Sequence, residues 1–228
     1  MTPYAWAVRA LFIAAAFVSA AFSGAAYAAD NTRYVSIAGN NANPCTLARP
    51  CKTLQRGVAM TPSGGELRIL DSGFYGNNAT IRKSLTITGN GNTVFLGATL
   101  TVNAPGAVVA VRELTINGQG TIPGGIHIAA ASTVHIERCV LHGFQTHGIS
   151  VFSVDAEVFV IGTTARDNGA SGLFTQPGTQ VRISNSTFTA NLIGINNVQG
   201  TIETRGNNTI RGNTTNVLGD ALTSFAGL

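Results

Sequence analysis

The stretch from residue 134 to residue 149 reads VHIERCVLHGFQTHGI, and it shows the pattern that decides the fold of this chain. Val134 and Ile136 are apolar residues at alternate positions, as in a strand with one buried face. The stretch closes on Gly148 followed by Ile149. Its cysteine and two histidines therefore have two interpretations: a functional site, or ordinary positions in a repeated unit.

Other segments repeat this pattern, each with two alternating apolar residues at its start and Gly followed by Ile or Leu at its end. They are VAVRELTINGQGTIPGGI (109–126), VFVIGTTARDNGASGL (158–173) and VRISNSTFTANLIGI (181–195), with a weaker copy in TIETRGNNTIRGNTTNV (201–217). The closing glycines, Gly125, Gly148, Gly172 and Gly194, are 23, 24 and 22 residues apart. A period of this length, built from short strands with Gly and Asn between them, is typical of a β-solenoid.

Stacking is what makes such a repeat stable, because one coil cannot bury its apolar side alone. Each strand pairs in parallel with its equivalent in the next coil, about 4.8 Å away. We expect equivalent side chains to form inward ladders, such as Val111–Ile136–Val160–Ile183. Gly and Asn are expected to supply the positive-φ bends between strands. Stacked amides of Asn168, Asn191 and Asn213 are expected to satisfy the backbone of the turns.

Strand-like runs separated by Gly and Asn continue upstream through residues 64–102, which gives about six or seven coils in total. The predicted fold is all-β: a single-stranded right-handed parallel β-helix with a short N-terminal capping helix within residues 50–61. The predicted division is a secretory signal (1–28), an N-terminal segment (29–63), the β-helix (64–219) and a C-terminal tail (220–228). In the tail, Leu222, Phe225 and Leu228 offer a partial cover for the last coil.

Residues 1–28 predict export. They hold one arginine, a short apolar run and an Ala-Tyr-Ala cleavage pattern, which indicates a signal peptide and a secreted or periplasmic protein. A membrane anchor is the alternative, but the apolar run is short for a bilayer span, and no later stretch is apolar enough for one. The 14 Lys and Arg residues are scattered, and no basic cluster with interleaved aromatic residues occurs. Nucleic acid is therefore not an expected partner, whereas a polysaccharide or cell-surface glycan is compatible with the composition.

Two of the three cysteines are close in sequence. Cys45 and Cys51 frame a short loop, and in an exported protein they are expected to form a disulfide. A metal site would need further ligands nearby, and the loop offers none. Cys139 occupies the position of Thr163 and Ser186 in the following coils, and we expect it to be a buried apolar filler.

The segment YVSIAGNNANPCTLARPCKTLQRGVAM (34–60), followed by GGELRILDSGFYG (64–76), resembles the opening of bacterial secreted right-handed parallel β-helix proteins of the pectate-lyase-like superfamily. The Asn-x-Gly-Ile coils downstream resemble their repeat, so the likeness covers nearly all of the chain after the signal. That superfamily includes polysaccharide lyases, polygalacturonase-type hydrolases, epimerases and phage tailspikes. The resemblance therefore implies the fold and leaves the chemistry open.

The motifs of the superfamily's enzymes are missing from the sequence. The NTD, DD and RIK motifs of polygalacturonase-like hydrolases and the DPH pattern of alginate epimerases do not occur. Calcium-dependent lyases need several converging carboxylates and a Lys or Arg base, but the chain has only 10 acidic residues. The densest group is Asp155, Glu157 and Asp167, beside which the repeat places Ala131 and Thr133 on one side and Thr179 and Gln180 on the other. No cofactor is expected, and Ca²⁺ would be implied only for a lyase-like activity.

Two sets of outward residues are the candidate sites. His142 and His147 align with Arg166 and Ser171 of the next coil. The candidate catalytic site is a cluster of His142, His147, Arg166 and Asp167. The alternative is that these are ordinary polar residues of turns. Phe152 and Phe159 are the candidate binding residues. Phe159 and Ile161 should face outward, with Phe152 and Phe174 flanking them, unless a loop or the C-terminal tail covers them.

Two functions follow from these observations. The favoured one is an exported, non-catalytic β-helix that binds glycans or a cell surface, or that serves as a scaffold. The alternative is a carbohydrate-active enzyme, polysaccharide lyase-like rather than a hydrolase, which acts on an acidic polysaccharide.

Overall fold

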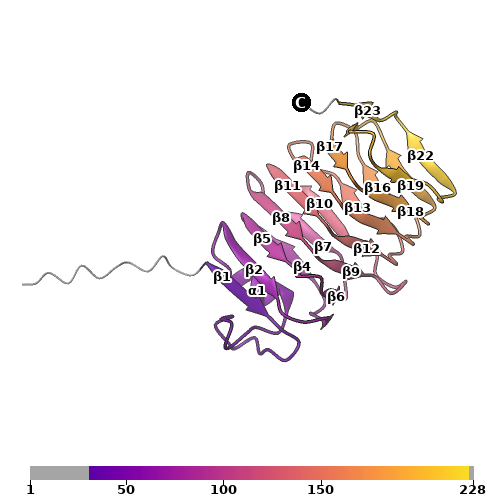
Figure 1. The fold of residues 1–228 in the computed structure, drawn as a ribbon. Helices are drawn as coiled ribbons and strands as arrows, with labels where there is room; N and C mark the ends of the chain where they lie inside the picture. The colour runs from indigo at the N-terminus through magenta and orange to yellow at the C-terminus, as the bar shows by residue number, and fades with distance from the viewer. Residues whose placement is uncertain (1–30, 226–228) are drawn as a thin grey trace, which may run out of the picture. The chain divides into compact units, whose positions relative to one another are not determined.

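The computed structural model describes residues 31–225, so the signal predicted for residues 1–28 and the predicted cover residue Leu228 lie outside the described part. Within residues 31–225 the chain forms three parallel β-sheets and one short helix. In Figure 1 the colour changes steadily from one end of the stack to the other, because each coil lies beside its neighbour in the sequence. The predicted β-solenoid is confirmed.

Each coil adds one strand to each sheet. The nine-stranded sheet contains β1 (Thr32–Val35), β2 (Gly65–Ile69), β5 (Leu85–Thr88), β8 (Val108–Arg112), β11 (Thr133–Glu137), β14 (Glu157–Ile161), β17 (Gln180–Ser184), β20 (Thr201–Thr204) and β23 (Thr223–Ser224). A seven-stranded sheet, called here the β10 sheet, contains β4 (Ala79–Ile81), β7 (Leu100–Asn103), β10 (Ile126–Ala130), β13 (Ile149–Val151), β16 (Ser171–Thr175), β19 (Ile193–Asn197) and β22 (Thr215–Gly219). The other seven-stranded sheet, the β12 sheet, contains β3 (Gly73–Phe74), β6 (Thr93–Phe95), β9 (Thr115–Asn117), β12 (Val140–His142), β15 (Thr164–Arg166), β18 (Thr187–Thr189) and β21 (Thr209–Ile210).

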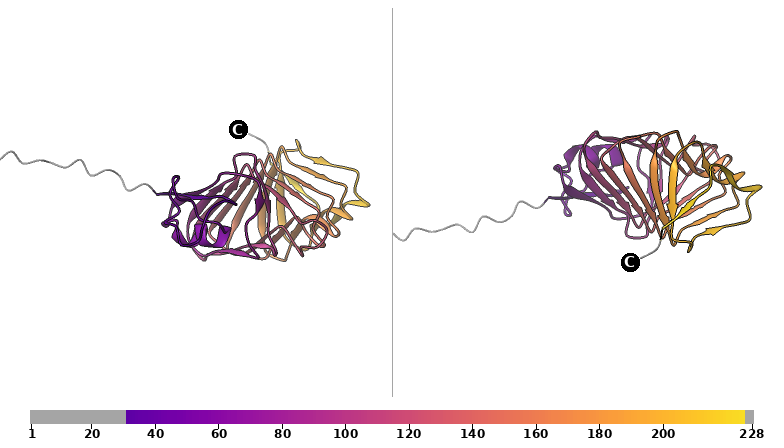
Figure 2. Two further views of the ribbon diagram at one scale, coloured as in Figure 1. Left: turned by 90° about the horizontal axis from the view of Figure 1, so that it is seen from below. Right: turned by 90° about the horizontal axis from the view of Figure 1, so that it is seen from above.

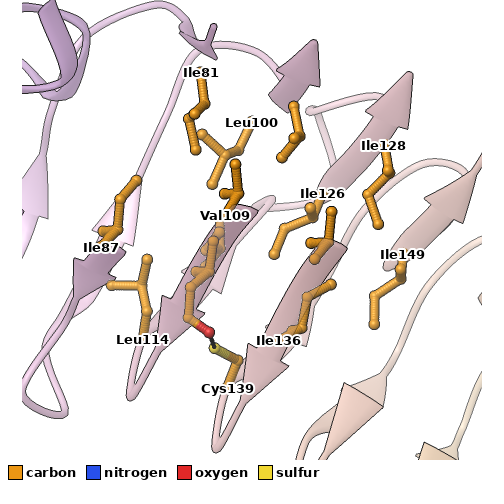
Figure 3. Close-up of a cluster of buried hydrophobic side chains, with 14 of the residues drawn as sticks. Ile81, Ile87, Leu100, Val109, Leu114, Ile126, Ile128, Ile136, Cys139 and Ile149 are labelled. Carbon is orange, nitrogen blue, oxygen red and sulfur yellow. Dashed lines mark hydrogen bonds between the residues drawn. The ribbon is translucent and has the colours of Figure 1, made fainter. Parts of the chain in front are cut away.

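The interior is built from ladders of apolar side chains. Ile136 pairs with Val111 on one side and with Val160 on the other, and Val160 pairs with Ile183. All four are fully buried, which confirms the predicted inward ladder and its register. Figure 3 shows part of this core, with side chains from facing sheets meeting inside the coil. Because every second residue of a strand points inward, the residues between them form the outer faces.

Cys139, the cysteine outside the disulfide, lies at a corner of the coil. Cys139 is buried, and its backbone amide donates to Thr163 Oγ1 (3.2 Å). The amide of Thr163 donates in turn to Ser186 Oγ (3.2 Å), so the three residues occupy equivalent corner positions as predicted. The thiol of Cys139 also lies 3.4 Å from the carbonyl oxygen of Val111 (Figure 3). Cys139 is thus part of the scaffold.

The closing glycines allow a close approach between coils and do not make the positive-φ bends. None of Gly125, Gly148, Gly172 and Gly194 has a positive φ. A Cβ on Gly125 would lie 2.4 Å from the carbonyl oxygen of Gly148, which shows that these residues allow neighbouring coils to approach closely. The positive-φ bends lie elsewhere, at corner residues such as Arg138, Gly162 and Asn185. Glycine and asparagine thus supply many of the positive-φ bends, as expected, but other residues such as Glu113 and Arg138 adopt them too.

The N-terminal end of the stack is closed by a helix and a disulfide loop. The predicted capping helix is α1 (Leu54–Met60), whose first turn is capped by Thr53 Oγ1 accepting from the amide of Arg56 (3.2 Å). A Cβ on Gly57 would lie 2.6 Å from a methyl group of Val35, so α1 packs tightly on the first coil, at the indigo end of Figure 2. The predicted Cys45–Cys51 disulfide is present in the loop before it.

The nine-stranded sheet extends into both end segments of the chain, through β1 and β23. In the tail, Leu222 packs against the core, while Phe225 follows β23, its amide donating to the carbonyl oxygen of Thr204 (3.1 Å). Within residues 31–225 no helix is long and apolar enough to cross a bilayer.

Candidate functional site

The structure brings together three of the four residues of the candidate catalytic cluster. His142, the last residue of β12, pairs with Arg166, the last residue of β15, and Arg166 forms an ion pair with Asp167. Burial lowers the pKa of His142, and the charge of Arg166 lowers it further, while Asp167 acts in the opposite direction. The single carboxylate of this cluster is already paired with Arg166, whereas glycoside hydrolysis needs two carboxylates in separate roles.

His147 belongs to a different part of the surface. It precedes β13, and its ring stacks on Phe174 of β16 with the ring centroids 4.6 Å apart and the planes at 19°. His142 therefore ends a strand of the β12 sheet, whereas His147 lies in the turn before a strand of the β10 sheet. The predicted alignment of His147 with Ser171 holds, because the amide of the adjacent Gly148 donates to the carbonyl oxygen of Ser171 (2.9 Å).

The outer side of the β10 sheet contains a hollow of about 270 Å³, called here the ring-lined hollow. Its lining consists of Thr99, Thr101, Pro123, Gly124, His127, Thr146, His147, Ser150 and Phe152. These residues come from β7, β10, β13 and the turns beside them, strands that lie next to one another in Figure 1. None of the lining residues is Asp, Glu, Lys or Arg.

Three rings that line this hollow, those of His127, His147 and Phe152, belong to a continuous cluster of four that Phe174 completes from behind the lining. The ring of His127 lies 4.8 Å from that of Phe152 in an edge-on arrangement. Phe152 lies 5.7 Å from Phe174, on which His147 stacks. Phe152 remains 38% exposed, so part of its surface is available to a ligand. Such rings present flat apolar faces together with polar edges, the combination that sugar rings pack against.

The register of the strands places residues of the hollow on one outward ladder. His127 pairs with Ser150, and Ser150 pairs with Phe174, so the three form one outward ladder across adjacent strands. Ser150, which has a small side chain, lies between the two ring-bearing residues of this ladder and lines the hollow. Ser150 Oγ also lies 3.0 Å from His127 Nδ1, a hydrogen bond that fixes the imidazole. Burial lowers the pKa of both His127 and His147, which keeps the two imidazoles neutral near pH 7.

His127 and Ser150 were not among the candidate residues, although the repeat contains the signal for them. Both stand two positions after a closing glycine, as Phe174 does, so the alignment of the repeats places all three on one outward ladder. The hydroxyl groups and neutral imidazoles of this surface can donate and accept hydrogen bonds, and the rings can stack. This chemistry suits an uncharged, hydroxyl-rich ligand.

Phe159, the other candidate binding residue, faces outward from the nine-stranded sheet as predicted. It is half-buried because its ring lies between His135, stacked at 4.9 Å and 8°, and the guanidinium of Arg182, 5.5 Å from the ring centroid. The expectation that Phe152 and Phe174 flank it is wrong, because those residues lie on the β10 sheet.

Within the described residues, two carboxylates, those of Glu157 and Glu203, meet at one arginine, Arg182. Glu157 pairs with Thr133 on one side and Gln180 on the other, as the repeat predicted, and its carboxylate contacts Arg182. Within residues 31–225 no group of three or more His, Cys, Asp or Glu residues is placed to hold a metal ion. The residues present therefore do not fit the calcium site that a lyase-like activity would imply.

Comparison with known proteins gives two matches. Residues 98–225 match a family model described as a right handed beta helix region. The crystal structure of pectate lyase Pel9A aligns with a TM-score of 0.54 and 15% sequence identity, over 76% of this chain and 52% of the lyase. The chain thus spans about half the length of that protein, and at this identity the likeness concerns the fold. No curated protein matches the sequence.

Proposed function

The chain belongs to the right-handed β-helix family, and on that premise we propose that it is an exported, non-catalytic protein that binds a glycan through the ring-lined hollow. The observation that carries this proposal is the cluster of His127, His147, Phe152 and Phe174 beside a set of hydroxyl-bearing side chains. Aromatic faces with a few placed polar groups are what binding sites for uncharged polar ligands require.

The dimensions of the site agree with a polymer as ligand. From Thr101 to Phe174 the outward ladder crosses four strands, which corresponds to about 14 Å along the stack, room for a short oligosaccharide. The open ends of the ladder allow a longer chain to continue across neighbouring coils. The solved structure named as a pectate lyase supports a polysaccharide as the ligand class.

A binding role fits this site better than catalysis. The ring-lined hollow has no carboxylate, lysine or arginine in its lining, so it lacks the charged acid and base groups of lyases and hydrolases. The disulfide between Cys45 and Cys51 supports export, because such bonds persist in oxidising compartments.

Affinity measurements with neutral polysaccharides and their oligosaccharides test the proposal. Phe174→Ala removes the ring that joins the two halves of the cluster, and we expect it to weaken binding about tenfold or more, equivalent to about 1.4 kcal/mol. Phe74→Ala is the matched control, since Phe74 is an exposed phenylalanine on the β12 sheet and should leave affinity unchanged. Equal binding by both variants would contradict the assignment of the ligand to this hollow.

A second measurement separates binding from catalysis. Release of reducing ends is followed across acidic and neutral polysaccharides, with and without calcium. We expect no release. Release that disappears in His142→Ala or Asp167→Ala would instead establish the enzymatic alternative and place the reaction at the β12 sheet.

A further inference from the structure

The core of the stack is open at its C-terminal end. One inward ladder of the β10 sheet consists of Ile126, Ile149, Leu173, Ile195 and Val217. The first four are fully buried, whereas Val217, in the last strand β22, is 38% exposed. Within residues 31–225 no strand pairs with the far side of β22, which lies at the outer edge of the yellow end in Figure 1. The helix α1 covers the opposite end, so the two ends of the stack differ.

The backbone of β22 can accept a further strand. In an earlier coil the amide of Ile126 donates to the carbonyl oxygen of Gly148 in the next coil (2.9 Å). Val217 holds the same position of the repeat as Ile126, so its amide points to the place where a next coil would lie. An unpaired strand edge of this kind pairs readily with another strand.

We propose that a second copy of this chain docks on this end, in a two-fold dimer joined end to end. A two-fold axis at Val217, perpendicular to the stack, sets β22 antiparallel to β22 of the second copy and brings the two Val217 residues opposite each other. The five residues of β22 thus pair with an edge of equal length. The proposal does not depend on the glycan site, because the ring-lined hollow lies on the outer side of the β10 sheet.

The other two sheets end in a way that suits the same rotation. The nine-stranded sheet has β23 beyond β20, whereas the β12 sheet ends at β21. The two-fold axis interchanges these two sheets, so β23 of each copy lies opposite β21 of the other. Each of these strands has two residues, and the step on one side fills the gap on the other. The end of the stack is therefore complementary to itself.

The charges beside β22 favour the antiparallel arrangement. Arg211 lies in the turn before β22, and Asp220 directly follows β22. Both are exposed, and within residues 31–225 neither side chain forms an ion pair. Antiparallel pairing brings the start of one β22 beside the end of the other. Arg211 of each copy then lies on the same side as Asp220 of the other, and the opposite charges attract.

The area of the end face is sufficient for a reversible dimer. For coils of 22 to 24 residues at about 3 Å each, the face with its outward side chains measures about 600 Å² per copy. Two copies then bury about 1,200 Å² in total, the lower limit for a specific interface. The centre of the face is apolar, since Ile210 and Leu222 pack there against the core beside Val217.

Sedimentation velocity of the exported protein over a range of concentrations tests the proposal. We expect a reversible change from one chain to two in the micromolar range, because the interface is near the lower size limit. Val217→Lys places a charge on the docking surface and should weaken dimerisation about tenfold or more. Val108→Lys is the matched control, because Val108 is an exposed valine of β8, away from both ends, and should leave dimerisation unchanged.

An exchange of charges tests the two-fold arrangement itself. Arg211→Asp and Asp220→Arg should each weaken dimerisation about fivefold or more, because each sets like charges beside one another. The double variant should restore dimerisation, since opposite charges then meet again. Arg82→Asp is the control, at an exposed arginine that follows β4 in the N-terminal part of the stack, and should have no effect.

Three results would overturn the proposal: the mass of one chain at every concentration, a dimer that resists Val217→Lys, or no restoration in the double variant. Assemblies larger than two chains would also contradict it, because they require stacking without closure. Residues 226–228 are the other candidate occupant of this end. A variant that lacks them should dimerise as the intact chain does, and a dimer that forms only in their absence would assign the end to these residues instead.

Discussion

The side-chain oxygen of Asn191 accepts two hydrogen bonds from Asn168, one from its side-chain amide at 2.9 Å and one from its backbone amide at 3.1 Å. Asn213 accepts in the same way from Asn191, at 3.1 and 3.0 Å. Each side-chain amide also donates to a carbonyl oxygen of the coil before it, as Asn191 Nδ2 does to Ala165 (3.0 Å). The predicted amide ladder is confirmed, and it satisfies both donors and acceptors of a buried turn.

Asn191→Ala should be strongly destabilising, because it leaves the buried donors of Asn168 without their acceptor. We expect the free energy of unfolding to fall by about 2–3 kcal/mol, measured by urea denaturation. Asn191→Asp should also destabilise, since a carboxylate can accept from Asn168 but cannot donate to Ala165. Asn103→Ala, at an exposed asparagine, should change the free energy by no more than about 0.5 kcal/mol. A similar loss at both positions would contradict a special role for the ladder.

Two adjacent glycines give a matched pair for the close approach of coils. A Cβ on Gly125 would meet the carbonyl oxygen of Gly148 at 2.4 Å, whereas a Cβ on Gly124 would meet nothing closer than 3.4 Å. We expect Gly125→Ala to lower the free energy of unfolding by about 2–3 kcal/mol or to prevent folding. Gly124→Ala should be neutral or slightly stabilising, because alanine reduces the entropy of the unfolded chain. The melting temperatures of the two variants, measured in parallel, test this difference. Equal melting temperatures would contradict the steric argument.

These contacts also show what the sequence could predict. The spacing of Gly125, Gly148 and Gly172 gives the register of every central strand, because one residue per coil must pack against its equivalent in the next. The same alignment predicts the inward ladder and the burial of Cys139. The repeat does not predict how side chains in the turns are oriented. The stacking of His147 on Phe174, for example, depends on the path of a turn that the repeat does not determine. The position of Phe225 beside Arg205 likewise depends on a tail outside the repeat.

The three cysteines should respond to thiol reagents in a fixed order. Cys139 is 1% exposed, and burial raises the pKa of its thiol to about 12, so the native protein should give no rapid reaction with Ellman's reagent near pH 8. Unfolding without reductant should expose one thiol per chain, and unfolding with reductant should expose three. Two or more thiols in the unreduced, unfolded protein would show that Cys45 and Cys51 are not bonded.

Removal of the disulfide should cost stability without abolishing the fold. The bond closes a short loop, for which the chain-entropy account gives about 2–3 kcal/mol. We therefore expect reductant to lower the melting temperature by several degrees while the far-ultraviolet circular dichroism of the parallel sheets is retained. The control is the variant Cys139→Ser treated with reductant. It lacks the free thiol, so a loss of stability on reduction must come from the Cys45–Cys51 disulfide. A complete loss of structure on reduction would indicate that the loop is needed for the first coil to form.

Acidification should destabilise the protein through its partly buried histidines. Burial lowers the pKa values of His127, His142 and His147 below the ordinary value of 6.5. As the pH falls through 6.5, these residues take up protons in the unfolded chain before they do so in the folded one. The unfolded state then binds more protons, so the free energy of unfolding must fall with decreasing pH in this window.

Urea denaturation between pH 7.5 and 5.5 measures this dependence, a range in which ordinary aspartates and glutamates remain charged. The triple variant His127→Gln, His142→Gln, His147→Gln should show a flatter profile than the unmodified protein, whatever its absolute stability. A steeper profile in the variant, or a gain in stability of the unmodified protein on acidification, would mean that these imidazoles are charged in the folded state. In that case the ring-lined hollow would carry positive charge at neutral pH, and a neutral glycan would no longer be the ligand that its chemistry favours.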